Sequence, residues 1–176
     1  KHDSVGILDS YFPDCAFFTE YERFDRHLER MRRMDEGKKI HYLSICAPNY
    51  LHDAHIRTAL RIGADALCEK PLVLNPWNVE AMQELEAYTG QRVWTILQLR
   101  VHPALIALRE KIQQERRQEK YELKLTYLTS RGQWYLRSWK GDVEKSGGLA
   151  TNIGVHFFDM LTWLFGPVER NEVHVS

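Results

Sequence analysis

The chain of 176 residues contains 24 Lys and Arg and 24 Asp and Glu, so its formal net charge is zero. A balanced charge gives no electrostatic footprint for nucleic acid or an anionic membrane, and no apolar run reaches the length of a membrane span. The three cysteines, Cys15, Cys46 and Cys68, lack metal-ligand spacing. We therefore expect no metal site and no disulfide framework, but reduced, buried thiols in a cytoplasmic protein.

The first half of the chain alternates between two periods. Helical patterns cover 20–34, 52–64 and 75–90, and strand patterns cover 41–47, 64–69 and 91–98. The first helix places Phe24, Leu28 and Met31 on one face. The third has Asn75 as a candidate N-cap and Gly90 beyond its last turn. Strands that alternate with helices of this length predict βαβ units and a parallel sheet.

The pattern changes in the second half. A helix is predicted over 103–118 and another over 151–166, a polar–aromatic loop joins them over 130–148, and a final strand begins at 171. Residues 121–129 alternate strictly, with Leu123, Leu125 and Tyr127 on one side, which predicts a half-buried strand of an antiparallel sheet. We place the domain boundary near 98–103. The expected fold class is α/β, with an incomplete Rossmann-type parallel sheet (1–98) followed by an α+β domain with an open antiparallel sheet (99–176).

The second predicted strand ends at Glu69, and Lys70 and Pro71 follow it. Ligands of open α/β sheets bind at the carboxyl ends of the strands, and a lysine in such a crevice can lose its proton and act as a base. Proline restricts the backbone on both sides, so we expect a cis Lys70–Pro71 bond. A surface lysine at a strand end would give the same tripeptide.

The segment 147–159 holds a second group of polar residues. On a helix, Asn152, His156 and Asp159 are spaced four and three apart and share one face. A histidine flanked by an amide and a carboxylate has a fixed tautomer and can relay a proton. Gly147 and Gly148 permit close backbone approach. A satisfied core histidine with a capping asparagine is the alternative interpretation.

The predicted loop over 130–142 is rich in aromatic rings and cations. Such residues can stack on a base and hold phosphates, and arginine binds carboxylates or pyrophosphates in a fork. A packed aromatic loop remains the alternative. The residues of interest are Arg131, Trp134, Tyr135, Ser138, Trp139 and Lys140, with Arg100 nearby.

Together, the strand ending in EKP, the QLRVHP segment and GG-x5-G-x-H-x2-D resemble the glucose–fructose oxidoreductase/inositol dehydrogenase (Gfo/Idh/MocA) family of nicotinamide-dependent sugar dehydrogenases. Segments such as SICAPNYLH, CEKPLV and ATNIGVHFFDML are most similar to its bacterial dehydrogenases of UDP-N-acetylglucosaminuronate. Two positions depart from the family pattern: Ser146 replaces the first of three glycines, and Asn152 replaces an acidic residue, which we interpret as a specificity feature.

The resemblance implies NAD as the cofactor and a UDP-sugar acid as the substrate. It implies that the sugar 3-hydroxyl is oxidised by hydride transfer, in surface-polysaccharide (diacetamido-mannuronate) biosynthesis. Lys70 and His156 would be catalytic, with either one as the base, and Asn152 would position the sugar. The polar–aromatic residues and Arg100 would bind the substrate. The implied cofactor contacts are Ala47, Pro48, Asn49, His52, Glu69, Lys70 and Gln98.

The family pattern also includes a glycine-rich first turn, which we expect to lie before Lys1, and further chain after Ser176. The resemblance implies a homo-oligomer, a tetramer in the full-length protein. Three other interpretations stay open: a dehydrogenase of the same fold for another sugar or inositol, a non-catalytic dinucleotide sensor, and a fragment that is inactive by itself.

Overall fold

The computed structural model describes residues 6–115 and 121–174. Its sheet has three parallel strands in the order β1 (Tyr42–Ile45), β2 (Asp65–Cys68) and β3 (Val93–Thr95). Ile45 pairs with Cys68, and Cys68 pairs with Thr95, so the three strands end at one edge. The predicted parallel sheet is confirmed, with shorter strands than the patterns suggested.

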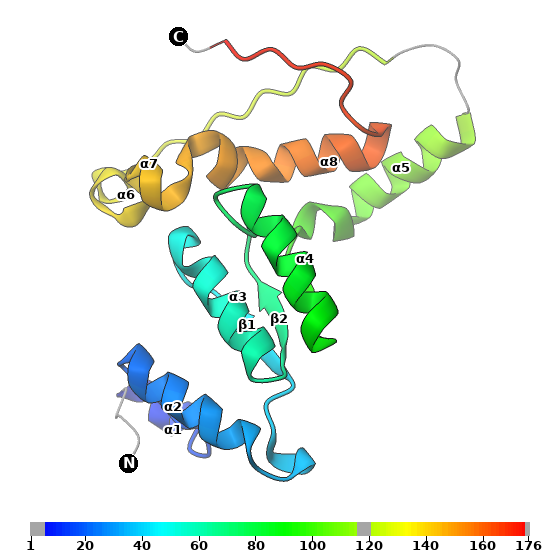
Figure 1. Cartoon of the computed structure of the whole chain (residues 1–176). Helices are drawn as coiled ribbons and strands as arrows, with labels where there is room; N and C mark the ends of the chain where they lie inside the picture. The colour runs from blue at the N-terminus through cyan, green and yellow to red at the C-terminus, as the bar shows by residue number, and fades with distance from the viewer. Residues whose placement is uncertain (1–5, 116–120, 175–176) are drawn as a thin grey trace.

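The helices are α1 (Ile7–Tyr11), α2 (Tyr21–Arg32), α3 (His52–Arg61), α4 (Trp77–Thr89), α5 (Pro103–Glu115), α6 (Gln133–Arg137), α7 (Val143–Ser146) and α8 (Val155–Phe165). Helices α1 and α2 lie at one end of the molecule, α3 and α4 in the middle, and α5 to α8 at the other end (Figure 1). Short 3-10 turns are η1 (Glu36–Lys38), η2 (Asn49–Leu51), η3 (Gln98–Val101) and η4 (Trp139–Gly141), and η5 (Ala150–Gly154) is a π-helical turn. No helix in the described ranges is long and apolar enough to cross a membrane.

The core of the first half lies between the sheet and the helices α3 and α4, which cover one of its faces (Figure 1). Its buried members are Ile45, Ile56, Ala59, Leu60, Ala66, Cys68 and Met82. Burial raises the pKa of the Cys68 thiol to about 12, which keeps this thiol protonated and unreactive. The expectation of buried thiols is wrong for the other two cysteines, since Cys15 and Cys46 are exposed.

The ends of α4 are set by local chemistry. Gly90 follows the last turn in the left-handed conformation (φ 75°), and its amide N–H donates to the Glu86 carbonyl, as its position predicted. The predicted N-cap is wrong, because the helix begins at Trp77 and Pro76 occupies the cap position without a side-chain hydrogen bond.

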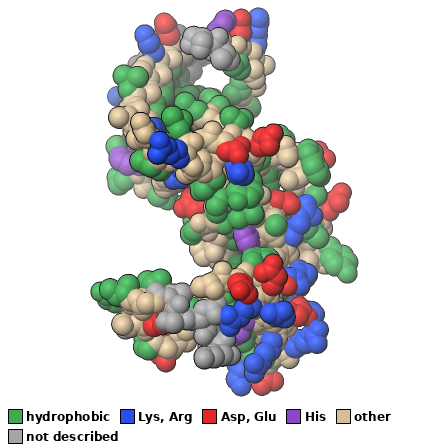
Figure 2. Space-filling view, turned by 90° about the vertical axis from the view of Figure 1, so that its left-hand side faces the viewer, with side chains coloured by type: hydrophobic (Ala, Val, Ile, Leu, Met, Phe, Trp, Pro, Cys, Tyr) green, Lys and Arg blue, Asp and Glu red, His purple; other side chains and the backbone are tan. Residues whose placement is uncertain are grey.

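Helix α2 packs on the far end of the sheet unit. Leu28 is buried with Ile62 and Ala64, and Phe24 packs beside them, as the helical period predicted. The polar face of α2 carries charges of both signs, which interleave over this lobe (Figure 2). Arg32 pairs with Glu29, and Arg61 pairs with Asp25, so the charge-rich sequence forms a solvated face with internal ion pairs.

The second half contains α5 and α8 but no strand in the described residues. The strand predicted over 121–129 is wrong. This segment is extended along α8, where Tyr121 stacks on Phe165 and Tyr127 stacks on Phe157. Among the described residues no other strand lies beside it to pair its backbone N–H and C=O groups, and its alternating side chains pack on a helix. The final strand predicted from 171 is also not formed over 171–174. The end of that strand (175–176) and the end of the helix predicted over 103–118 (116–118) lie outside the described residues.

Candidate active site

Three turns follow the three strands at the carboxyl edge of the sheet and face the segment that contains α7, η5 and α8 (Figure 1). They span 46–51 after β1, 69–76 after β2 and 96–102 after β3. In open parallel sheets this edge is where ligands bind. The residues singled out in the sequence fall on these turns, at the start of α3, on η5 and α8, and on the segment that contains α6 and η4.

Lys70 reaches from the turn after β2 to the second half of the chain. Its Nζ donates a hydrogen bond of 2.5 Å to the backbone oxygen of Asn152, which is 82 residues away. The Glu69 carboxylate accepts from the Lys70 backbone N–H at 3.3 Å. The Lys70–Pro71 bond is cis, as predicted. The long cation after β2 therefore connects the sheet edge to η5.

Burial lowers the pKa of the Lys70 amine, and the nearby cations Lys140 and Arg131 lower it further. The Glu69 carboxylate opposes this shift. Because the neutral amine is the form that accepts a proton, these neighbours favour Lys70 as a base.

The acceptor of Lys70 lies in a π turn. Residues 150–154 form η5, and Asn152 in this turn is 5% exposed. A π turn disturbs the regular ladder of helix hydrogen bonds and is often found at functional sites. Gly147 allows the backbone to approach here: its φ is +78°, and a Cβ at this position would lie 2.8 Å from Leu74 and Thr151 atoms.

His156 lies in the first turn of α8, four residues after Asn152. Its Nδ1 is buried and has no hydrogen-bond partner. Burial lowers the pKa of the imidazole, and the charge of Lys70 lowers it further. The ring is thus biased towards its neutral form, which has one nitrogen free to accept a proton. The structure brings Lys70 and His156 together.

Asp159 does not fix the tautomer of His156, contrary to the expectation from helical spacing. Its two carboxylate oxygens accept from Arg100, with distances of 2.9 Å from Nε and 2.5 Å from Nη2. The Arg100 guanidinium, which was predicted to bind the substrate, is therefore engaged in an ion pair with α8. No local pattern indicated this pair, since its members are 59 residues apart.

Asn49 and His52, which were predicted to contact the cofactor, are both buried. Asn49 Nδ2 donates to the Ser146 backbone oxygen at 2.8 Å and to Asn152 Oδ1 at 3.2 Å. The two ring nitrogens of His52 lie 2.7 Å from the Pro71 oxygen and 2.9 Å from the Ala47 oxygen. Both side chains thus bind other parts of the chain. Ser146, whose backbone oxygen accepts from Asn49, is also buried and was not predicted as a site residue. Its position before two glycines was the signal that could have indicated it.

Ala47 and Pro48 are half-buried in the turn after β1, and Gln98 is exposed at the start of η3. All three lie at the carboxyl edge of the sheet, as the strand pattern predicted. With Glu69 and Lys70 they are the predicted cofactor contacts that are not fully buried.

The polar–aromatic segment is folded into α6, η4 and α7, so the prediction of a long loop is wrong. The Arg131 guanidinium lies 5.2 Å from the centre of the Tyr135 ring. The Lys140 amine lies 5.5 Å from the Trp134 ring centre and 5.6 Å from that of Trp139.

Ser138 begins η4. Its hydroxyl accepts from the Lys140 backbone N–H and donates to the Tyr135 backbone oxygen. The Ser138 side chain thus fixes the backbone of this segment. The charges of Arg131 and Lys140 both act on Lys70. The segment therefore brings two cations to the Lys70 amine.

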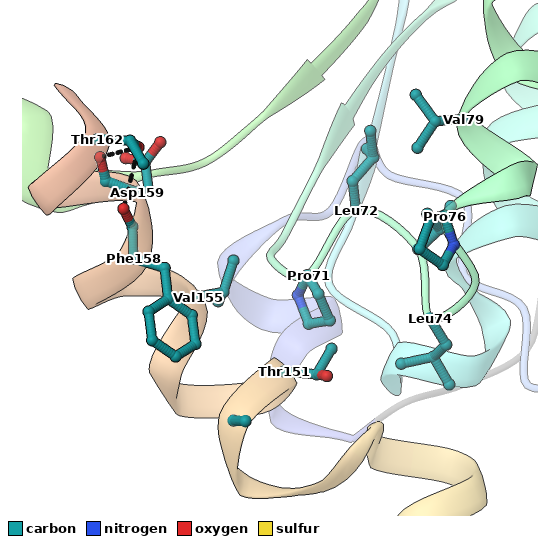
Figure 3. A pocket seen from close by; sticks show the side chains of 12 residues that line it. Pro71, Leu72, Leu74, Pro76, Val79, Thr151, Val155, Phe158, Asp159 and Thr162 are labelled. Atoms are coloured by element: carbon teal, nitrogen blue, oxygen red, sulfur yellow. Dashed lines mark hydrogen bonds between the residues drawn. The ribbon is translucent and has the colours of Figure 1, made fainter. Parts of the chain in front are cut away.

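A cavity of about 550 Å³ lies between α8 and the turn that follows Lys70 (Figure 3). Its walls are mostly apolar: Leu72 and Leu74 face Val155 and Phe158 across the space. Lys70 and His156 are not among its lining residues. The cavity is adjacent to the amine–imidazole pair, on the side where Pro71 and Asp159 lie.

The arrangement thus provides two proton acceptors, Lys70 and His156, beside two cations at the edge of a parallel sheet. Such a site can take a proton from a hydroxyl and hold an anion. No group of three His, Cys, Asp or Glu suited to a metal ion occurs in the described parts of the chain.

The chain belongs to the Gfo/Idh/MocA oxidoreductase family. Residues 1–97 match its NAD-binding Rossmann fold, and residues 109–176 match its C-terminal alpha/beta domain. Among solved structures, the chain is similar to the WlbA (WbpB) dehydrogenase from Thermus thermophilus, crystallised in complex with NAD and UDP-GlcNAcA. The two are 55% identical with a TM-score of 0.86, over 98% of this chain and 55% of that one.

Other relatives are more distant. The WlbA dehydrogenase from Bordetella pertussis is 23% identical with a TM-score of 0.77, over 93% of this chain and 44% of that one, and supports the fold alone. The putative oxidoreductase YteT of Bacillus subtilis is 26% identical, over 94% of this chain and 40% of the relative. The chain thus spans about half the length of the proteins that it matches.

Proposed function

We propose that the protein is an NAD-dependent dehydrogenase that oxidises the 3-hydroxyl of UDP-N-acetylglucosaminuronate. The observation that carries the proposal is the 55% identity to the Thermus thermophilus dehydrogenase crystallised with NAD and UDP-GlcNAcA. The convergence of Lys70 and His156 at the carboxyl edge of the sheet supports it independently. The pathway that we propose is surface-polysaccharide biosynthesis.

The reaction removes two hydrogens from one carbon–oxygen unit. The hydroxyl proton passes to Lys70 or His156, hydride leaves C3, and the product is a 3-keto sugar. Lys70 is our preferred base, because burial and its cationic neighbours favour the neutral amine. His156 then relays the proton. Asn152, which was predicted to position the sugar, is itself buried, so we assign it to the support of Lys70, whose amine donates to its backbone oxygen.

The residues present fit the nicotinamide end of NAD, which supplies the hydride acceptor when bound. Glu69 and Lys70 stand at the end of β2, and Gln98 stands after β3. The unpartnered Nδ1 of His156 is a buried polar atom that a bound ligand would satisfy. We propose Ala47, Pro48, Glu69, Lys70 and Gln98 as the part of the cofactor site that this chain supplies.

The substrate that we propose carries a carboxylate and a pyrophosphate. Arg131 and Lys140 are suited to these anions, and Trp134 and Trp139 offer ring faces beside them. Tyr135 is buried, so we assign it to the support of Arg131 and Asn152 rather than to substrate contact.

We also propose a cytoplasmic homo-oligomer. Leu123, Leu125 and Leu128 are exposed on the segment along α8 and would contribute to the contact between subunits. Light scattering on the full-length protein tests this, and a monomer at micromolar concentration would contradict it.

The test of function is turnover by the full-length protein with NAD and UDP-N-acetylglucosaminuronate. NADH formation measures the rate, and mass spectrometry identifies the keto product. UDP-N-acetylglucosamine, which lacks the carboxylate, and free inositol are the matched comparisons. Faster oxidation of either comparison compound would redirect the proposal to another sugar, and absence of NAD binding would refute it.

A further inference from the structure

Two buried side chains outside the catalytic pair lie on either side of Lys70. Asn49 belongs to η2, and His52, three residues later, begins α3. His52 is 0% exposed and Asn49 is 4% exposed. Side chains without exposed surface do not contact a cofactor at the sheet edge, so their polar groups require another explanation.

His52 fixes the chain immediately after Lys70. Its Nδ1 lies 2.7 Å from the Pro71 oxygen, and its Nε2 lies 2.9 Å from the Ala47 oxygen. Carbonyl oxygens only accept, so the imidazole is the donor; a neutral ring donates to one of the two and a doubly protonated ring to both. The bond to Pro71, which requires the proton on Nδ1, is the one that ties His52 to the turn that carries Lys70.

Asn49 fixes the group to which the Lys70 amine donates. Its Nδ2 donates to Asn152 Oδ1 and to the Ser146 oxygen, and the Asn152 backbone oxygen accepts from Lys70 Nζ. These bonds are formed between residues 97 and 103 positions apart. An unsatisfied buried donor or acceptor costs about 1–3 kcal/mol, so each bond favours one placement of η5.

We propose that Asn49 and His52 are positioning residues that hold Lys70 from both sides, His52 through its backbone and Asn49 through its acceptor. They act on the cofactor only through the placement of the amine. This inference rests on the proposed function, because it assigns a role in that reaction. It replaces the cofactor contacts expected of both residues.

The test compares kcat with KM in the full-length protein. Asn49→Leu and His52→Phe remove the donors while keeping similar volume, and His52→Gln keeps one donor. We expect kcat to fall about tenfold or more in the first two and less in His52→Gln, because misplacing a reacting group costs rate. KM for NAD should change less than about threefold, since positioning acts on the reacting geometry more than on uniform binding.

Two matched controls separate position from general damage. His55→Phe changes a histidine one turn further along α3, whose ring packs on Tyr21 at 4.9 Å between ring centres. Asn75→Leu changes an exposed asparagine that lines the same small cavity as Asn49. Both should keep wild-type kcat. A raised KM for NAD with unchanged kcat in the Asn49 and His52 variants would overturn the proposal.

A readout without turnover keeps this inference separable from the proposed function. The ¹³Cε signal of Lys70, assigned with Lys70→Arg, should titrate at higher pH in Asn49→Leu and His52→Phe, because the released amine gains solvation. Identical titration in the wild type and both variants would refute the positioning role even if the protein oxidises no sugar.

If a variant fails to fold, a measurement on the wild-type protein tests the inference instead. NMR couplings across the hydrogen bonds from His52 to Pro71 and from Asn49 to Ser146 should be present, and their absence would overturn the inference.

Discussion

Arg100 and Asp159 form a two-pronged ion pair that joins η3 to α8. Two nitrogens of the guanidinium contact two oxygens of the carboxylate, and the Asp159 side chain is only 13% exposed. Since Asp159 follows His156 by three residues, this pair fixes the helix that presents the imidazole. It does so without contacting the Lys70 amine.

Replacing Asp159 with Asn should lower the free energy of unfolding by about 1 kcal/mol or less, because Arg100 is nearly half exposed and solvent screens the pair. Urea denaturation of the variant measures the change. Glu36→Gln, which breaks an exposed pair with Lys39, is the control and should cost even less. A loss above about 3 kcal/mol would mean that the pair behaves as a buried one.

Lys70→Ala should reduce turnover by roughly 100–10,000-fold, the usual contribution of a general acid–base group. NAD binding and the melting temperature should remain close to those of the wild type, because the amine is only half-buried. Steady-state kinetics and cofactor titration measure the two effects. Lys111→Ala, on the exposed face of α5, is the control. Near-normal turnover in Lys70→Ala would remove this residue from the chemistry.

The pH dependence should follow the cations around Lys70. Lys140 lowers the pKa of the Lys70 amine, so Lys140→Gln raises this pKa towards its ordinary value. If the neutral amine is the base, activity falls as pH drops through the pKa of Lys70. The acid limb of the kcat/KM profile should then move to higher pH in Lys140→Gln. Lys145→Gln, whose amine pairs with Asp142, should leave the limb in place. A shift to lower pH would exclude Lys70 as the base.

Arg131→Ala should weaken binding of the UDP-sugar acid about tenfold or more and leave NAD binding nearly unchanged. A hydrogen bond between charged groups contributes roughly 1.5–3 kcal/mol, and Arg131 approaches the site from the segment proposed to hold the substrate. Isothermal titration with each ligand separates the two affinities. Arg137→Ala, an exposed arginine of α6, is the matched control. Equal losses for both ligands would contradict this assignment.

Gly147→Ala should cost about 2–5 kcal/mol of stability. The positive φ of +78° contributes roughly 1–2 kcal/mol. The new Cβ would also lie 2.8 Å from Leu74 and Thr151 atoms, and such overpacking typically costs about 1–3 kcal/mol. Gly63→Ala separates the two effects, because Gly63 has a φ of +80° and open space around it. Equal losses in both variants would show that contact at Gly147 is unimportant.

The sequence predicted the elements whose signals are local. The period of Phe24 and Leu28 predicted the buried face of α2, and Gly90 predicted the end of α4. The turn after β2 was also recognisable, because Lys70 and Pro71 follow an apolar strand. Each of these features depends on neighbours within a few residues, so one sequence is enough to predict it.

Features that depend on distant partners were not predictable. Alternation over 121–129 indicated a strand, but a strand also requires a neighbouring strand, and this segment packs on α8 through Tyr127 and Phe157. Nothing local indicated that Arg100 would bind Asp159 or that Asn49 would bind Asn152. The short helical turns of the polar–aromatic segment were missed because they also depend on distant contacts, such as that of the Tyr135 hydroxyl with Asn152, 17 residues away.

The π turn at 150–154 sets the rotational phase of everything that follows it. One residue of an α-helix corresponds to a rotation of about 100°. Deleting a residue between Asn152 and His156 would therefore rotate the imidazole by about that angle relative to the backbone oxygen that holds the Lys70 amine. Insertions and deletions in these five positions should for that reason be far less tolerated than substitutions, even though no covalent chemistry takes place there.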